Sequence, residues 1–177
     1  MIGVLVSGEG TNLQALIDAG LPIAAVASNR GDAGALARAD AAGIPNRVFE
    51  LDGYSERAAR DRELADWLQL RGVDLVVLAG YMHLLTPAFL DRFRDRIVNV
   101  HPSLLPQFPG GRAIADALDA GVDTTGVTVH YVDEGLDTGA VIRQEPVAVE
   151  PRATLVERIH AVAHRILPEV VRELCAH

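Results

Sequence analysis

Residues 4–13 read VLVSGEGTNL, an apolar run that passes through two glycines into the start of an amphipathic segment. Short apolar runs bounded by turn residues are typical of buried strands, and Gly8 and Gly10 allow a tight backbone turn between such a strand and a helix. The stretch therefore predicts a strand, a glycine turn and a helix in direct succession. Units of this kind build sheets of parallel strands with helices packed on them.

The rest of the chain continues this alternation of apolar runs with Ala- and Arg-rich amphipathic segments. Buried strands are predicted at residues 2–6, 23–27, 74–79 and 97–100, and helices at residues 12–19, 33–42, 55–70, 87–93, 112–120 and 154–175. Two later strands, 127–131 and 140–147, flank a turn-rich segment without a helix between them. We expect one Rossmann-like α/β domain over residues 1–177. Its mostly parallel, twisted sheet would have helices on both faces and an antiparallel strand pair in the C-terminal half.

The last predicted helix carries the clearest local signals. Apolar residues recur along it every three or four positions, and Thr154 and Glu157 have the spacing of a capping box. Gly72 and Gly121 stand just past two other predicted helices, where a residue in the left-handed conformation commonly ends a helix.

Composition excludes several classes of function. The formal charge is −8, and all 16 basic residues are Arg. Such a chain lacks the basic surface that nucleic-acid binding needs, and without Lys it can form neither a Schiff base nor a Walker A phosphate contact. Cys175 is the only cysteine, which excludes a disulfide framework and fits a reducing compartment. No secretory signal and no apolar run of roughly 18 residues is visible, so we expect a cytoplasmic protein without membrane or nucleic-acid partners.

The glycine turn is a candidate anion site. Gly8 and Gly10 would let the backbone approach a ligand, and the helix that follows points free N–H groups and its positive end at it. A phosphate is the simplest occupant, and a tight turn without a ligand is the alternative. A dinucleotide site would need a third glycine where Leu13 stands and an acidic residue at the end of the second strand, which instead reads SNR at residues 28–30.

Asn99 and His101 lie two residues apart at the end of a predicted strand, so their side chains project to the same side. Pro102 and Pro106 stiffen the chain that leaves the strand. An amide and an imidazole together can donate hydrogen bonds to an oxygen that becomes negative during acyl transfer. The alternative is that both side chains satisfy local backbone groups.

The chain resembles the folate-dependent formyltransferases, and most closely the glycinamide ribonucleotide formyltransferases, over nearly its whole length. The matching motifs are SGEGTNLQ at residues 7–14, LAGYMHLLTPAF at 78–89, NVHPSLLP at 99–106 and GVTVHYVDEGLDTGAVI at 126–142. NVHPSLLP and LDTGAVI together indicate a formyltransferase. SGEGTNLQ indicates the glycinamide ribonucleotide enzymes, in which it cradles the substrate phosphate.

This resemblance implies transfer of a formyl group from 10-formyltetrahydrofolate, a co-substrate, to the primary amine of glycinamide ribonucleotide in de novo purine biosynthesis. No metal would take part. Asn99 and protonated His101 would stabilise a tetrahedral intermediate, with Asp137 assisting the imidazole. Residues 1–100 would form the phosphate-binding half of the domain, and residues 101–177 would carry the catalytic loop and the folate-binding half.

The resemblance also implies two sets of substrate contacts. The ribonucleotide would meet Gly10, Thr11, Asn12, His160 and Ala163. The folate would meet Arg57, Met82, His83, Leu84, Leu85, Asn99, Asp133, Glu134, Gly135, Leu136 and Asp137. For Arg57 a solvated helix charge is the alternative interpretation, and for His130 we expect a supporting role near the site.

Three positions depart from the family pattern. Ala163 stands where the family commonly has a Glu that meets the ribose hydroxyls, so ribonucleotide binding would be weaker unless a neighbour such as His164 or Glu157 compensates. His83 stands where Arg is usual beside the pterin, and Arg112 occupies a position that is often His. None of the three belongs to the expected catalytic trio.

Other readings of the sequence stay open. The acceptor could be another amine, on a sugar nucleotide or an aminoacyl-tRNA, or the protein could bind folate and nucleotide without turnover. His160 and His164 have the helical spacing of zinc ligands, but Ala161 stands where a zinc protease needs Glu. Small molecules are the expected partners, and the chain is expected to be a monomer or a homodimer.

Overall fold

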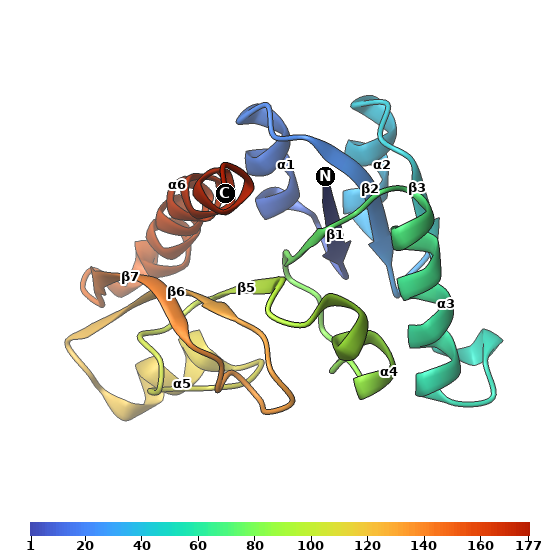
Figure 1. Ribbon diagram of the computed structural model, residues 1–177. Coiled ribbons are helices and arrows are strands. Elements are labelled where there is room, and N and C mark those ends of the chain that lie inside the picture. Colours follow the sequence, from blue (N-terminus) through green and yellow to red (C-terminus); the bar gives the residue numbers. More distant parts are fainter. The chain divides into compact units, whose positions relative to one another are not determined.

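Seven strands form one sheet in the computed structural model, which describes all residues from 1 to 177 (Figure 1). The strand order is β3-β2-β1-β4-β5-β6-β7. The strands are β1 (Ile2–Val6), β2 (Ile23–Ser28), β3 (Asn46–Val48), β4 (Leu75–Leu78), β5 (Ile97–His101), β6 (Thr124–Tyr131) and β7 (Val141–Ala148). The helices are α1 (Thr11–Asp18), α2 (Gly34–Ala41), α3 (Arg57–Leu70), α4 (Pro87–Leu90), α5 (Ala113–Ala120) and α6 (Leu155–Cys175). The chain divides into two units, Met1–Val98 and Asn99–His177.

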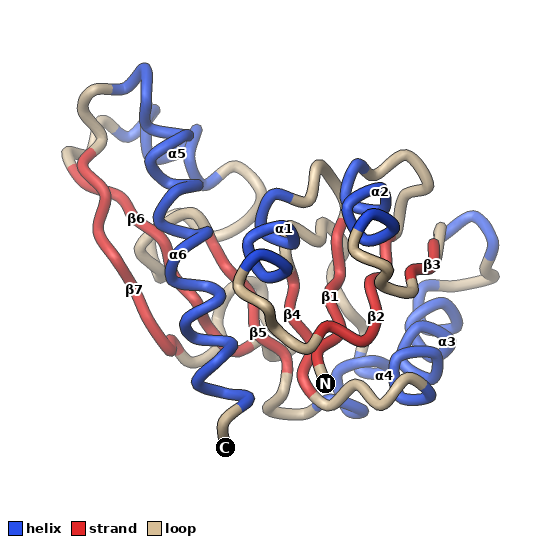
Figure 2. The backbone as a smooth tube through the Cα atoms, turned by 90° about the horizontal axis from the view of Figure 1, so that it is seen from above, coloured by secondary structure: helices blue, strands red, loops and turns tan.

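The first unit is a parallel sheet with a pair of helices on each side (Figure 2). β1 pairs in parallel with β2 and with β4, and β2 pairs in parallel with β3. Every residue of β1 and β4 is buried, as expected for strands covered on both faces. α1 packs against α2, and α3 packs against α4. The predicted strand–turn–helix unit at the start of the chain is confirmed.

In the second unit β6 and β7 form an antiparallel pair, and α6 packs against both strands (Figure 1). Their register runs from Thr124 opposite Ala148 to His130 opposite Val141, with an irregularity after Val129. The apolar stripe of α6 is buried at Leu155, Ile159, Ile166 and Val170. The expected antiparallel pair in the C-terminal half is therefore confirmed. None of the helices has the length and apolarity that crossing a bilayer requires.

Two local features differ from the sequence-based expectation. The strand β3 was not predicted, because its three residues are too few to show an alternating pattern and it is defined by pairing with β2. The capping box was wrong: the Thr154 hydroxyl donates to the Pro151 carbonyl at 3.3 Å and accepts from Arg158 Nε at 3.0 Å. A turn of 3-10 helix, Arg152–Thr154, precedes α6 instead. The left-handed glycines past two helices are confirmed, with φ of 73° at Gly72 and 67° at Gly121.

Gly10 holds the first turn against the second helix. Its φ is 77°, and a Cβ at this position would lie 2.5 Å from the Cβ of Ala35, the second residue of α2. A side chain there would both force a left-handed conformation and collide with the core. A Cβ at Gly8, two residues earlier, would meet no atom within 4 Å, so this position has no comparable constraint.

We predict that Gly10→Ala lowers the free energy of unfolding by about 2–5 kcal/mol, the sum of the left-handed penalty and the overpacking cost. Gly8→Ala should change it by less than about 0.5 kcal/mol. Chemical denaturation followed by circular dichroism measures both values. Equal stabilities of the two variants would contradict the role assigned to Gly10.

Candidate active site

The carboxyl end of β5 presents Asn99 and His101. The His101 side chain is buried, and both of its ring nitrogens face an acceptor: Nε2 lies 2.8 Å from the Phe108 carbonyl and Nδ1 lies 3.4 Å from Asp137 Oδ2. Since a carbonyl can only accept, Nε2 donates to Phe108, and Nδ1 is the ring nitrogen that faces the carboxylate.

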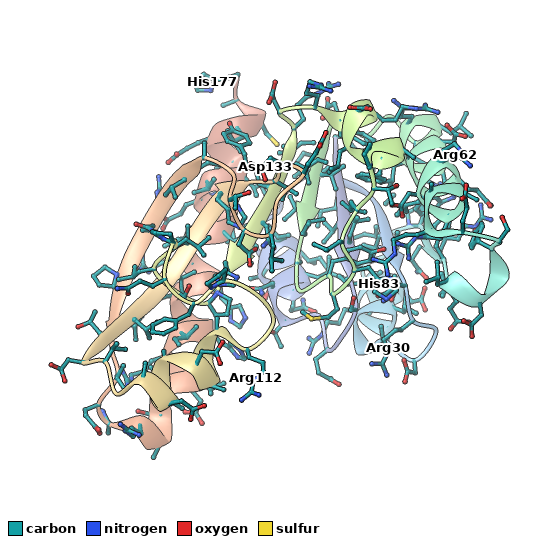
Figure 3. The ribbon with its side chains drawn as sticks, turned by 90° about the horizontal axis from the view of Figure 1, so that it is seen from below. Arg30, Arg62, His83, Arg112, Asp133 and His177 are labelled. Atoms are coloured by element: carbon teal, nitrogen blue, oxygen red, sulfur yellow. The ribbon has the colours of Figure 1, made fainter.

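Asp137 is held in place by backbone conformation and by one hydrogen bond. Its φ is 54°, in the left-handed region, and its Oδ2 accepts from the Gly110 N–H at 2.8 Å. The loop that carries it is braced by Asp133, whose Oδ1 accepts from the Gly135 N–H at 2.9 Å and from the Thr138 hydroxyl at 2.7 Å. Figure 3 labels Asp133 in this segment between β6 and β7. Asp137 is therefore not an ordinary turn residue, because its carboxylate faces His101 and His130.

His130 has a larger part in the cluster than the sequence indicated. Its Nδ1 donates to the Tyr131 carbonyl at 2.8 Å, and its Nε2 lies 3.3 Å from Asn99 Nδ2 and 3.7 Å from Asp137 Oδ1. Burial lowers the pKa of His130, which favours the neutral ring. Neutral Nε2 then accepts from the Asn99 amide and fixes its orientation, while the second N–H of that amide stays available. The only sequence signal for this was the place of His130 near the end of a predicted strand.

The four side chains form a connected group within the second unit. Asn99 contacts His130, His130 faces Asp137, and Asp137 faces His101. The structure therefore brings together the three residues that the sequence predicted as catalytic, with His130 as a fourth. An amide donor and an imidazole beside a carboxylate can stabilise an oxyanion and move a proton.

The glycine turn and residues 82–85 lie together in the first unit. Gly10 is the N-cap of α1, so the N–H groups of Thr11 and Asn12 have no helical acceptor. The Ser7 hydroxyl donates to Asn29 and accepts from the Met82 N–H at 2.9 Å, which ties the turn to the segment after β4. The buried Oδ1 of Asn12 has no protein partner. Free N–H groups at the N-terminus of a helix can donate to an anion, so this turn is the place where the predicted phosphate contacts lie.

The predicted folate contacts of the first unit lie on and beside that segment. Met82 and Leu84 are large apolar side chains exposed at 68% and 59%, which is typical of a surface that a ligand covers. Arg57, at the start of α3, donates to the Leu84 carbonyl at 3.3 Å. It is therefore tied to this segment and is not merely a solvated charge. His83 and Leu85 are half-buried.

The remaining predicted contacts lie in the second unit. Glu134, Gly135 and Leu136 are exposed along the loop after β6. On α6, His160 is exposed whereas the Ala163 side chain is buried. The ring of His164 lies 6.0 Å from that of His160, and its buried Nε2 has no partner. No group of three or more His, Cys, Asp and Glu is arranged to hold a metal.

Arg112 stands just before α5 and reaches toward the surface (Figure 3). Its guanidinium lies 4.0 Å from Asp116 and 3.9 Å from Asp119. These are exposed ion pairs, so the departure at this position touches none of the four clustered side chains.

Comparison with known proteins agrees with this geometry. A sequence model described as formyl transferase matches residues 1–171. Phosphoribosylglycinamide formyltransferase of Haemophilus influenzae is 43% identical over 97% of this chain and 85% of its own length. Trifunctional purine biosynthetic protein adenosine-3 of Chironomus tentans is also 43% identical over 97% of this chain, which spans 13% of that protein.

Solved structures show the same relationship. The crystal structure of glycinamide ribonucleotide transformylase 1 from Symbiobacterium toebii has a TM-score of 0.94 and 47% identity, covering 97% of this chain and 85% of that chain. By sequence and by fold, the chain belongs to the formyl transferase family and, within it, to the phosphoribosylglycinamide formyltransferases.

Proposed function

We propose that this protein transfers the formyl group of 10-formyltetrahydrofolate to the primary amine of glycinamide ribonucleotide, a step of purine biosynthesis. The single observation that carries the proposal is the linked group of Asn99, His130, Asp137 and His101, found in a chain of this family. The lone cysteine fits a reducing compartment, so we assign the reaction to the cytoplasm. The partners are small molecules, and the chemistry needs no metal.

The proposed reaction is an acyl transfer through a tetrahedral intermediate. The amine nitrogen attacks the formyl carbon, and the carbonyl oxygen becomes an oxyanion that accepts from Asn99 Nδ2 and from protonated His101. When the intermediate collapses, the bond between the formyl carbon and the folate nitrogen breaks, that nitrogen takes a proton, and the former amine loses one. We assign His101 as the group that supplies the proton taken by the folate nitrogen. Asp137 stabilises the charged ring.

Substrate binding is assigned by the same reasoning. Main-chain N–H groups of Gly10, Thr11 and Asn12 would hold the phosphate. The phosphate-binding half of the domain would then be residues 1–100. His160 would face the ribonucleotide. The folate would contact residues 82–85 and Arg57 of the first unit, and residues 133–137 of the second unit.

A second acceptor amine is favoured by one observation. Ala163 is buried and has no polar group, so it cannot accept hydrogen bonds from ribose hydroxyls. Incubating the purified protein with 10-formyltetrahydrofolate and following release of tetrahydrofolate separates the candidates. Turnover with glycinamide ribonucleotide supports the leading function, and turnover only with other amines supports the second. Binding without any turnover would contradict both.

We predict that His101→Ala and Asp137→Asn each reduce kcat by about 10²–10³, the usual cost of losing one group that stabilises an oxyanion. The thermal midpoint and circular dichroism spectrum should change little for Asp137→Asn, because an amide oxygen can still accept from the Gly110 N–H. Steady-state kinetics at saturating substrates measure the effect. A folded variant that keeps near-normal kcat would refute the role given to that residue.

We predict that Ala163→Glu lowers the KM for glycinamide ribonucleotide while leaving the KM for folate unchanged, because a carboxylate would supply acceptors for the ribose. Ala163→Gln, of similar size, is the matched control for volume and should have a smaller effect. An unchanged KM for the ribonucleotide in a folded Ala163→Glu variant would show that this departure is inconsequential.

A further inference from the structure

The core of the first unit contains an ion pair that the proposed mechanism does not use. Arg60 and Asp61, successive residues of α3, are both fully buried, and Arg60 Nε lies 2.7 Å from Asp61 Oδ1. Arg60 Nη2 is buried without a hydrogen-bond partner. Taking two charges out of water costs free energy, and an unsatisfied donor adds to the cost. Stability alone therefore does not account for the pair.

Both members of the pair are bonded to the segment after β4. Asp61 Oδ2 accepts from the Thr86 N–H at 2.7 Å and from the Thr86 hydroxyl at 2.8 Å. At the other end of the segment the Met82 N–H donates to Ser7. Residues 82–86 are thus anchored at both ends, although Met82 and Leu84 between the anchors are exposed.

Arg60 fixes the chemical form of His83. Its Nη1 lies 3.0 Å from His83 Nδ1, and a guanidinium can only donate, so Nδ1 must be the accepting nitrogen of a neutral ring. The proton is then on Nε2, for which the structure shows no protein acceptor. Figure 3 labels His83 on this segment, next to α3.

Burial and the two arginines beside His83 favour its neutral form, and they outweigh the one carboxylate that opposes them. Burial together with the Arg60 and Arg57 guanidinium groups lowers the pKa of His83, and Asp61 only partly opposes them. The Tyr81 ring packs edge-on at 6.0 Å, and burial raises its pKa to about 12, so its hydroxyl stays protonated. Protonation of His83 would place an N–H on Nδ1 against the guanidinium.

We propose that the buried Arg60–Asp61 pair positions residues 82–86, the segment that contacts the folate. Through this pair, His83 is presented as a neutral donor, with its Nε2–H directed to an acceptor atom of the reduced folate. The inference rests on the proposed function, which sets the pterin against residues 82–85. Ring nitrogens and the carbonyl of a pterin are suitable acceptors. Arg60 and Asp61 are positioning residues, and His83 contacts the folate.

The test is the pH dependence of the KM for 10-formyltetrahydrofolate, measured separately from kcat between about pH 5 and about pH 8. His83 is neutral above its lowered pKa, so the KM of the unmutated protein should be lowest near neutrality and should rise as the pH falls through that pKa. kcat should not follow this rise. Arg60→Met should raise the KM about tenfold near neutrality, because the ring is no longer held in one tautomer.

Arg60→Met should also move the acid rise in KM to higher pH, since a cation that lowers the pKa of His83 has been removed. His83→Gln keeps an acceptor for Arg60 and a donor for folate but cannot titrate, so it should retain the KM and lose the acid rise. Arg62→Met is the matched control: this exposed arginine of the same helix pairs with Glu56 at 3.4 Å and should change nothing.

An unchanged KM and pH profile in folded Arg60→Met would overturn the inference, as would an acid rise that persists in His83→Gln. If Arg60→Met does not fold, His83→Leu decides the question, because loss of the donor should raise the KM about tenfold in a folded protein. Failure of the unmutated protein to transfer formyl to glycinamide ribonucleotide would contradict the proposed function instead. Calorimetric binding of tetrahydrofolate to the same variants would then test the inference alone.

Discussion

The carboxylate of Asp137 lies between two imidazoles, and the arrangement of the candidate site depends on it. It faces His101 at 3.4 Å and His130 at 3.7 Å, and the Gly110 N–H holds it there. The two rings differ in what their other nitrogens meet. The Nε2 of His101 donates to the Phe108 carbonyl and its Nδ1 faces the carboxylate, whereas buried His130 donates through Nδ1 to the Tyr131 carbonyl and has a lowered pKa. The same carboxylate thus faces both rings, and the neutral ring of His130 orients the amide of Asn99.

A few local features of the backbone position the clustered side chains. β5 ends at His101, and a left-handed residue at position 137 turns the loop after β6 so that its carboxylate faces inward. In the first unit, the glycine turn and the segment after β4 are joined through the Ser7 hydroxyl. The proposed phosphate and folate contacts of that unit are therefore parts of one bonded framework. A substitution in the core beneath this framework should therefore change substrate affinity more than the rate of the chemical step.

Sequence patterns predicted the strands and helices whose apolar periodicity is sustained, such as β1, β4 and α6. They missed β3, which exists only through its pairing, and they gave a capping box to Thr154, whose hydroxyl is instead engaged by Pro151 and Arg158. The Asn99–His101–Asp137 grouping was predictable from the motifs that carry it. The depth of His130 in the cluster was not, because a single histidine on a strand looks the same whether it is buried or exposed. The burial of Arg60 could not be predicted for a similar reason: in a helix rich in charged residues, no local pattern shows which arginine points into the core.

In the proposed mechanism Asn99 and His101 converge on one substrate oxygen. The decisive experiment is a crystal structure of the protein with glycinamide ribonucleotide and a non-transferable analogue of formyl folate. We expect the formyl oxygen to lie within hydrogen-bond distance, roughly 2.7–3.1 Å, of both Asn99 Nδ2 and a ring nitrogen of His101. A complex in which that oxygen is out of reach of both donors, while Asp137 remains at the imidazole, would contradict it.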